Sequence, residues 1–268
     1  MASHAHTVLV TGASAGIGAA MAREYARQGW DVALSARRAA PMEALAAKIR
    51  AMGQRAEVFT ADLFDPATPK RLYDDVVARM GQVDGLVNNA GYGHGGSYLD
   101  SPWEDHARFL QLMLTAPSEM SRYASADMAA RGFGRIVNVA SLAGHLPGTR
   151  GHTLYAAVKS YLIRFSESLN AELTESGIHA TAVCPGFTYT EFHDVNGTRA
   201  ELNKLPEWMM QSAEDVAREA LEANARNKAV YITGGVNKSI ALLGRALPGD
   251  MMRKMIAKQS SKFRRDSA

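Results

Sequence analysis

The chain has 268 residues, of which 47% are hydrophobic, and its 30 basic and 27 acidic residues give a net charge of only +3. This composition can bury a large core, so we expect one domain over residues 1–268, and so small a net charge argues against a surface built for nucleic acid. The single cysteine, Cys184, cannot form an internal disulfide, and no apolar run fits a membrane span or a signal sequence, so we expect a cytoplasmic protein.

Short apolar strands alternate with longer amphipathic helices along the chain. Strands are expected near residues 7–11, 31–36, 56–61, 83–89, 135–141, 178–183 and 229–235. The first helix is expected to end near residue 28, and the others are expected near residues 41–52, 66–80, 104–131 and 155–176. Strands that alternate with helices pair in parallel through crossover connections. The pattern therefore predicts an α/β fold, a doubly wound, Rossmann-like sheet of seven parallel strands with helices on both faces.

Two later segments interrupt this rhythm. Residues from about 188 to 208 are irregular and could fold over a substrate, and residues from about 240 to 268 form an amphipathic, basic tail that begins with Leu242 and Leu243. The tail could pack on the body or on a partner subunit, or it could make weak contact with an anionic membrane surface or an acyl carrier. His4 and His6 are interpreted as tail residues, and no metal site is expected.

A glycine-rich turn, TGASAGIG, follows the first strand and opens the first helix. Gly12 permits a tight turn, Gly16 lets the backbone approach a pyrophosphate, and Gly18 allows close packing, while the helix start offers free N–H groups to an anion. Ligands of doubly wound sheets bind at this carboxyl edge of the strands. Taken alone, such a turn can also simply connect a strand to a helix.

Tyr155 and Lys159 lie one helical turn apart, and Ser141 ends the fifth strand. Positions i and i+4 share a helix face, so the ammonium group can lie close to the phenol. A free tyrosine has a pKa of roughly 10, and a positive charge about 4 Å away could supply the roughly 4 kcal/mol needed to lower that pKa toward 7. The alternatives are a packed aromatic beside a solvated lysine and a serine that caps a turn.

The G-x-x-x-G-x-G turn, the NNAG sequence at Asn88–Gly91, Ser141 and Tyr155-x-x-x-Lys159 together resemble the short-chain dehydrogenase/reductase family over about residues 7–235. The resemblance implies hydride transfer between a nicotinamide and a carbonyl or alcohol carbon. It implies that Ser141 binds the substrate oxygen, that Tyr155 exchanges the proton, and that Lys159 lowers the tyrosine pKa and holds the ribose. The cofactor residues that it implies are Gly12, Ser14, Gly16, Ile17, Gly18, Asp62, Leu63, Asn88, Ala90, Gly91, Tyr155, Lys159, Pro185, Gly186, Thr188 and Thr190.

The end of the second strand reads SARR and bears on the choice of cofactor. Ala36 stands where an acidic residue would bind the 2′-hydroxyl of NAD, and Arg37 and Arg38 follow it. Planar guanidinium groups suit a 2′-phosphate, so NADP(H) is favoured over NAD(H), the alternative being a solvated loop.

Met113 is the one departure from the family pattern. Many relatives carry an asparagine there, which supports a water-linked proton path to the lysine. No asparagine occurs between Asn89 and Asn138. A thioether donates no hydrogen bond, so any relay would use a main-chain carbonyl, Thr115 or water alone.

The substrate is expected to contact Leu146, His152, Phe187, Tyr189 and Phe192, although such residues would equally pack a lid. These side chains suit a small to medium hydrophobic carbonyl compound or alcohol. We therefore expect an NADP(H)-dependent oxidoreductase, and the resemblance implies a homodimer or homotetramer. The alternatives are a nucleotide-sensing regulator without turnover and a membrane-peripheral reductase of acyl or lipid ketones.

Overall fold

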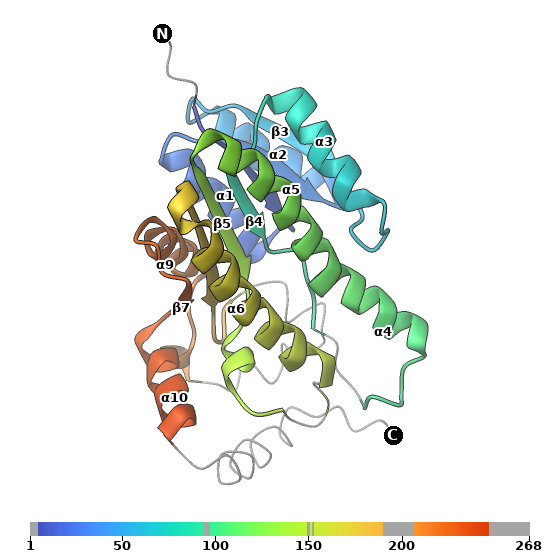
Figure 1. Ribbon diagram of the computed structural model, residues 1–268, viewed down its shortest axis with the longest axis vertical. Coiled ribbons are helices and arrows are strands. Elements are labelled where there is room, and N and C mark those ends of the chain that lie inside the picture. Colours follow the sequence, from blue (N-terminus) through green and yellow to red (C-terminus); the bar gives the residue numbers. More distant parts are fainter. Residues whose placement is uncertain (1–4, 94–96, 149–150, 152, 190–205, 247–268) are drawn as a thin grey trace.

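A computed structural model describes residues 5–93, 97–148, 151, 153–189 and 206–246. Figure 1 shows a central sheet with helices packed on both of its faces. In the part of the chain so described, no helix is both long and apolar enough to cross a membrane.

The sheet contains seven parallel strands in the order β3-β2-β1-β4-β5-β6-β7. The strands are β1 (Thr7–Thr11), β2 (Asp31–Ala36), β3 (Ala56–Thr60), β4 (Gly85–Asn88), β5 (Gly134–Val139), β6 (Ile178–Cys184) and β7 (Val230–Ile232). Strand β1 is buried at every position, as expected for a sheet covered on both faces. The strand order reverses between β1 and β4, where such folds bind their ligands. The prediction of a doubly wound seven-stranded sheet is confirmed.

Helices form one layer on each face of the sheet. The first layer packs its apolar residues against one face and consists of α1 (Gly16–Arg27), α2 (Ala39–Arg50) and α9 (Ala213–Ala225). The second layer covers the other face and consists of α3 (Thr68–Met80), α4 (Trp103–Leu110), α5 (Ala116–Arg131) and α6 (Thr153–Leu173). Helix α10 (Gly235–Ala246) follows β7, and short 3-10 turns cover Leu142–His145, Thr174–Ser176 and Glu207–Met209.

The helix expected over residues 104–131 is interrupted. A π-helical turn, Gln111–Thr115, separates α4 from α5, so the prediction of one regular helix is wrong there. Pro117 gives the physical reason. It has no N–H group, so it cannot donate a hydrogen bond to the carbonyl of Met113 or of Leu112 in the preceding turn. The Ala116 N–H donates instead to the Gln111 carbonyl, five residues back.

Helix α9 lies outside the helices expected from the sequence. Its N-terminus is capped by Ser212, whose hydroxyl accepts a hydrogen bond of 3.0 Å from the Asp215 N–H. A serine followed three residues later by an acidic residue is a start signal that could have revealed this helix. Of the predicted basic tail, only the part within α10 is described, and there Leu242 and Leu243 are exposed. Residues 247–268 and 190–205 lie outside the described residues.

A buried hydrogen-bond network joins the ends of β4 and β5 to two helices. The Asn88 amide donates to Asn138 Oδ1 at 2.8 Å and to Ser121 Oγ at 3.0 Å. The Asn138 amide donates to Ser166 Oγ at 2.9 Å. These partners lie on β4, β5, α5 and α6, so the network fixes the position of the helices that carry Met113 and Lys159 relative to the sheet.

Candidate active site

The glycine-rich turn and the turn after β4 are built as one unit. Thr11 Oγ1 accepts hydrogen bonds from the Asn89 N–H at 3.0 Å and the Ala90 N–H at 3.2 Å. The Asn89 amide returns a bond of 3.0 Å to the Thr11 carbonyl. Gly12 has a φ of +66°, and a Cβ added to it would lie 2.8 Å from Ala90 Cα, so only glycine fits.

The start of α1 fits a phosphate group. Gly16 has a φ of +56°, which turns the backbone into the helix. No side chain caps this helix, and its first turn contains no acidic residue. No side chain of the helix start therefore competes with a bound anion for the first N–H groups. Such a helix start attracts a phosphate. The predicted pyrophosphate residues, Gly12, Ser14, Gly16 and Ile17, all lie in this turn and helix start. Gly18 packs closely, as predicted, since a Cβ added to it would lie 2.5 Å from the Gly12 carbonyl oxygen.

The end of β2 and the loop after β3 form the neighbouring part of the carboxyl edge. The Arg38 guanidinium donates to Ser14 Oγ at 3.1 Å, which places it against the glycine-rich turn. Arg37 lies elsewhere, with its guanidinium carbon 5.4 Å from the centre of the Phe64 ring. Leu63 is buried, and the Asp62 carboxylate accepts a hydrogen bond of 3.2 Å from the Phe64 N–H. The two predicted arginines therefore occupy different places around the expected adenosine position.

Ser141, Tyr155 and Lys159 lie together beyond the ends of β5 and β6. Ser141 has an extended backbone, and its hydroxyl accepts a hydrogen bond of 3.1 Å from the Ala143 N–H and also bonds to Tyr155. The interpretation of Ser141 as a turn cap is therefore confirmed, and its hydrogen bond to a substrate oxygen stays a prediction. The Lys159 ammonium lies 5.6 Å from the centre of the Tyr155 ring. It donates to the Val139 carbonyl at 2.7 Å.

Burial governs the proton affinity of this group. It raises the pKa of the Tyr155 phenol above its ordinary value, and the hydrogen bond with Ser141 opposes this increase only in part. Burial lowers the pKa of Lys159 to about 8, with an opposing effect from nearby Cys184. The net direction for Tyr155 is upward and is set by burial, so the expected lowering of its pKa by Lys159 stays a prediction for the enzyme with nucleotide bound.

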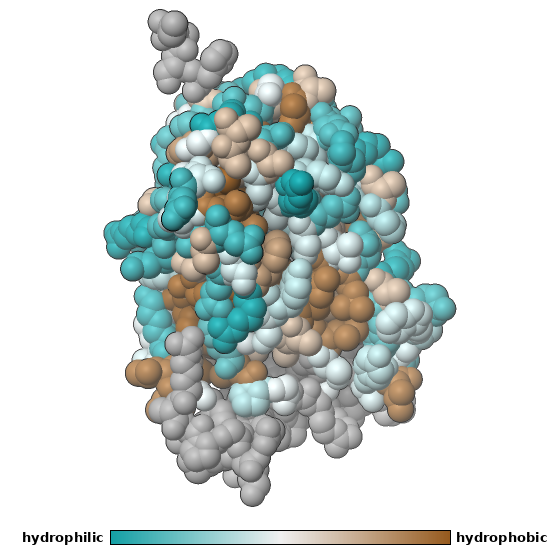
Figure 2. Space-filling view, viewed as in Figure 1, coloured by the Kyte–Doolittle hydropathy of each residue, from teal (hydrophilic) through white to brown (hydrophobic). Residues whose placement is uncertain are grey.

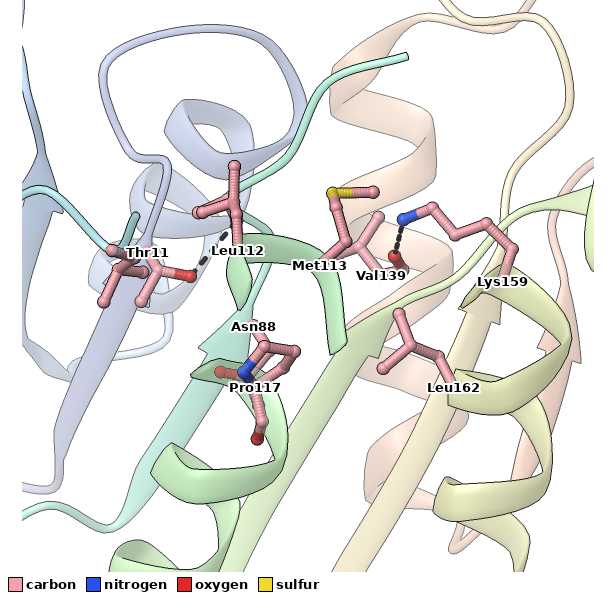
Figure 3. A pocket seen from close by; sticks show the side chains of 10 residues that line it. Thr11, Asn88, Leu112, Met113, Pro117, Val139, Lys159 and Leu162 are labelled. Carbon is pink, nitrogen blue, oxygen red and sulfur yellow. Dashed lines mark hydrogen bonds between the residues drawn. The ribbon is translucent and has the colours of Figure 1, made fainter. Parts of the chain in front are cut away.

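Met113, in the π-helical turn between α4 and α5, lies beside Lys159. Figure 3 shows its thioether and the Lys159 ammonium pointing toward one another beside a cavity of about 10 Å³. The cavity is also lined by the polar residues Thr11 and Asn88 and by Pro117. Its other lining residues are apolar, and its size is about that of one water molecule. The π-helical turn therefore places a small cavity and a thioether, rather than a side-chain amide, beside the lysine.

The segment after β6 closes the carboxyl edge on its other side. The Leu142 N–H donates to the Pro185 carbonyl at 2.8 Å, which ties this segment to the Ser141 turn. Thr188 is buried, and its hydroxyl donates to the Gly186 carbonyl at 3.2 Å. Phe187 and Tyr189 are joined to Gln211 through backbone hydrogen bonds of 3.0 Å on either side of Thr188.

The remaining predicted residues divide into two groups. Leu146 ends the 3-10 turn after Ser141, and Gly91 lies against Met113, since a Cβ added to this glycine would lie 2.6 Å from the methionine sulfur. Thr190, His152 and Phe192 fall outside the described residues. Within the described residues, no group of three or more histidine, cysteine or acidic side chains could hold a metal ion.

Comparison with known proteins agrees with this geometry. Residues 6–200 match the family model described as short chain dehydrogenase. Nodulation protein G of Rhizobium sp. (strain N33) is 36% identical over 241 residues, which cover 88% of this chain and 96% of that protein. A solved structure, the short-chain dehydrogenase from Sphingobium yanoikuyae in complex with NADPH, is 32% identical with a TM-score of 0.78 and 98% of each chain covered.

A second solved structure is similar over almost the whole chain. It is the bulky-bulky ketone specific alcohol dehydrogenase from Comamonas testosteroni, which is 29% identical with a TM-score of 0.76, covering 99% of this chain and 98% of that one. The family match, the strand order and the glycine-rich turn lead to one conclusion. The chain belongs to the short-chain dehydrogenase/reductase family and is an NAD(P)-dependent oxidoreductase.

Proposed function

We propose that this enzyme is an NADP(H)-dependent reductase of small to medium hydrophobic ketones or aldehydes, with Ser141, Tyr155 and Lys159 as its catalytic residues. The observation that carries the proposal is the grouping of a serine hydroxyl, a protonated phenol and a buried ammonium beside a turn shaped for pyrophosphate. NADPH would supply the hydride when it is bound.

The choice of NADP(H) rests on the end of β2. Ala36 offers no carboxylate to a ribose hydroxyl, and Arg38 already lies 3.1 Å from Ser14 in the glycine-rich turn. A guanidinium there can bind a 2′-phosphate through two parallel hydrogen bonds. The Sphingobium relative with NADPH bound supports the same choice.

Tyr155 is proposed to act as a general acid. Its raised pKa keeps the phenol protonated near neutral pH, so it has a proton to give to the oxygen of a reduced carbonyl. Ser141 would donate a second hydrogen bond to that oxygen and so stabilise its developing negative charge. Lys159 would hold the nicotinamide ribose and remain mostly protonated at neutral pH, since its pKa is about 8.

The proposed substrate class rests on the walls near this group. Leu146, Phe187 and Tyr189 lie on the turns next to Ser141 and after β6, and Tyr189 is 48% exposed. The Comamonas relative is described as specific for bulky ketones, which supports a hydrophobic carbonyl substrate here. His152 and Phe192 stay predictions for the substrate site, and Thr190 stays a prediction for the nicotinamide site.

We also propose that the chain folds as one domain and assembles into a homodimer or homotetramer through α4, α5 and α6. Figure 2 shows a group of hydrophobic side chains between α4 and α6, one of several on this face. Near the start of α4, Leu99 is 89% exposed and Trp103 is 61% exposed. The buried free thiol of Cys184 agrees with the proposed cytoplasmic location.

The test combines binding with turnover. The purified protein should bind NADPH with a lower Kd than NADH, and it should oxidise NADPH when supplied with one or more of a panel of hydrophobic ketones. Tyr155→Phe should lower kcat about 100-fold or more while leaving the NADPH Kd within twofold, because only the proton donor is removed. Tight binding of NADPH without turnover on any carbonyl compound would favour the nucleotide-sensing regulator instead.

A further inference from the structure

Phe64, in the loop between β3 and α3, binds two guanidinium groups. The guanidinium carbon of Arg37, at the end of β2, lies 5.4 Å from the centre of the ring. That of Arg108, on α4, lies 4.9 Å from the same centre. A cation over an aromatic face is held without using its N–H groups, so both guanidinium groups keep donors for a ligand.

The position of the Phe64 ring is fixed by other aromatic residues. Its centre lies 5.8 Å from that of Tyr92, and the Tyr92 ring lies 5.3 Å from that of Phe109, with both pairs in edge-to-face geometry. Phe109 lies on α4 and is fully buried in the core. This row of rings connects the loops after β3 and β4 to α4, so the two arginines are held on a fixed support.

The positive charge of the cluster formed by Phe64, Arg37 and Arg108 is only partly balanced. Within the described residues, neither Arg37 nor Arg108 forms an ion pair with a carboxylate. Both arginines lower the pKa of the Tyr92 phenol, which burial and Asp105 raise, so both positive charges act on the same place. Like charges brought to one ring repel each other, and a bound anion would relieve that repulsion.

The cluster lies at the adenosine end of the proposed nucleotide site. Arg37 is next in sequence to Arg38, which lies against the glycine-rich turn, and Phe64 directly follows Leu63, which is predicted to contact the adenine. Arg108 precedes Leu112 by four residues on the same helical segment. Arg108 therefore reaches the Phe64 ring from α4, whereas Arg37 reaches the same ring from the end of β2.

We propose that Arg108 is a specificity-determining residue for the 2′-phosphate of NADPH. Arg37 and Arg108, held on the Phe64 ring, would contact this phosphate from one side, and Arg38 would contact it from the glycine-rich turn. A phosphate monoester dianion is the chemistry that two unpaired planar guanidinium groups suit. The proposal rests on the proposed NADP(H) dependence and adds to it a cation from α4.

Equilibrium binding tests this role without turnover. The Kd values of Arg108→Ala for NADPH and NADH are measured by isothermal titration calorimetry. The NADPH Kd should rise about tenfold and the NADH Kd should stay within twofold, because only NADPH carries the extra phosphate. Arg108→Lys should keep part of the NADPH affinity, because it keeps the charge and loses the planar fork. Arg122→Ala, which removes an exposed arginine from α5, is the matched control and should change neither Kd.

The outcomes separate this inference from the proposed function. Equal weakening of NADPH and NADH would overturn it, because Arg108 would then contact the adenine ring or another shared group. An unchanged NADPH Kd in Arg108→Ala would also overturn the inference. If the wild-type protein still preferred NADPH in that case, the proposed function would stand. Wild-type protein that binds neither dinucleotide would overturn both. Phe64→Leu, which removes the ring and keeps both arginines, should give a smaller loss specific to NADPH.

Discussion

Lys159 shows how a single side chain at this site is held at a cost to folding. Only 8% of it is exposed, and its ammonium bonds to one backbone carbonyl, that of Val139. Its pKa in the folded protein, about 8, lies below the ordinary value of 10.5. The folded state therefore binds its proton more weakly than the unfolded state does, so the buried charge destabilises the fold wherever the lysine is protonated.

Lys159→Met should therefore stabilise the protein while abolishing turnover. A shift from 10.5 to about 8 corresponds to a penalty of about 3 kcal/mol at pH 7, partly offset by the loss of the bond to Val139. We expect a net gain of about 1 kcal/mol in the free energy of unfolding, measured by urea denaturation at pH 7. The penalty is fully present below about pH 8 and disappears as the pH rises to 10.5, so the variant's advantage should shrink over that interval.

The exposed Lys48→Met on α2 serves as the control for that measurement and should show no such pH dependence. An advantage of Lys159→Met that stayed constant from pH 8 to 10.5 would show that the lysine is not buried as a charge.

Met113 tests whether the proton path needs a side-chain amide. Because the cavity beside Lys159 is about the size of one water and has Thr11 and Asn88 in its lining, Met113→Asn should change kcat by less than about threefold. Met113 is almost fully buried, so the shorter, polar asparagine should lower the free energy of unfolding by about 1 to 3 kcal/mol. Steady-state kinetics and urea denaturation measure the two effects. A tenfold rise in kcat would mean that the missing amide limits the natural enzyme.

At the scale of elements, the π-helical turn joins a local sequence feature to the chemistry. Pro117 leaves the carbonyls of Leu112 and Met113 without a donor at residue 117, and both of these residues line the cavity beside Lys159. A carbonyl without its helical donor can accept a hydrogen bond from a water molecule there. We propose that the proline in this way leaves a backbone acceptor near Lys159, at the place where the family resemblance implies an asparagine.

Pro117→Ala should remove this acceptor. Alanine supplies the missing N–H, so the turn can return to regular α-helical bonding and occupy the Met113 carbonyl. We expect the melting temperature to rise or stay equal and kcat to fall several-fold, as measured by circular dichroism and steady-state kinetics. Pro69→Ala, in the first turn of α3, is the control, because a proline there displaces no helical bond and its loss should leave kcat unchanged.

Elements that depend on local pattern were predictable from the sequence, and those that depend on distant partners were not. The strands and the glycine-rich turn follow from apolar runs and from glycine positions, and the grouping of Ser141 with Tyr155 follows from their places just after β5 and on α6. The raised pKa of Tyr155 depends on burial by residues far along the chain. The contact of Arg108 with Phe64 joins positions 44 residues apart in sequence, for which no spacing rule exists.

At the scale of the whole molecule, the proposed site uses both halves of the sheet. The glycine-rich turn, Arg38 and Leu63 belong to the half formed by β1, β2 and β3, whereas Ser141, Lys159 and Thr188 lie at the ends of β5 and β6 or on α6. A dinucleotide that spans the edge would contact both halves at once. Because such a site exists only in the folded chain, binding should stabilise the molecule as a unit.

NADPH should therefore raise the melting temperature of the whole protein in a single transition. At a free concentration of about 100 times its Kd, a ligand that binds only the folded state adds about 2.7 kcal/mol, which corresponds to roughly 5 to 10 °C for a chain of this size. NADH at the same concentration should give a smaller shift, because Arg37, Arg38 and Arg108 would lack the phosphate. Differential scanning calorimetry measures both shifts. Two separate transitions, with only one of them moved by NADPH, would show that the nucleotide contacts one half of the sheet alone.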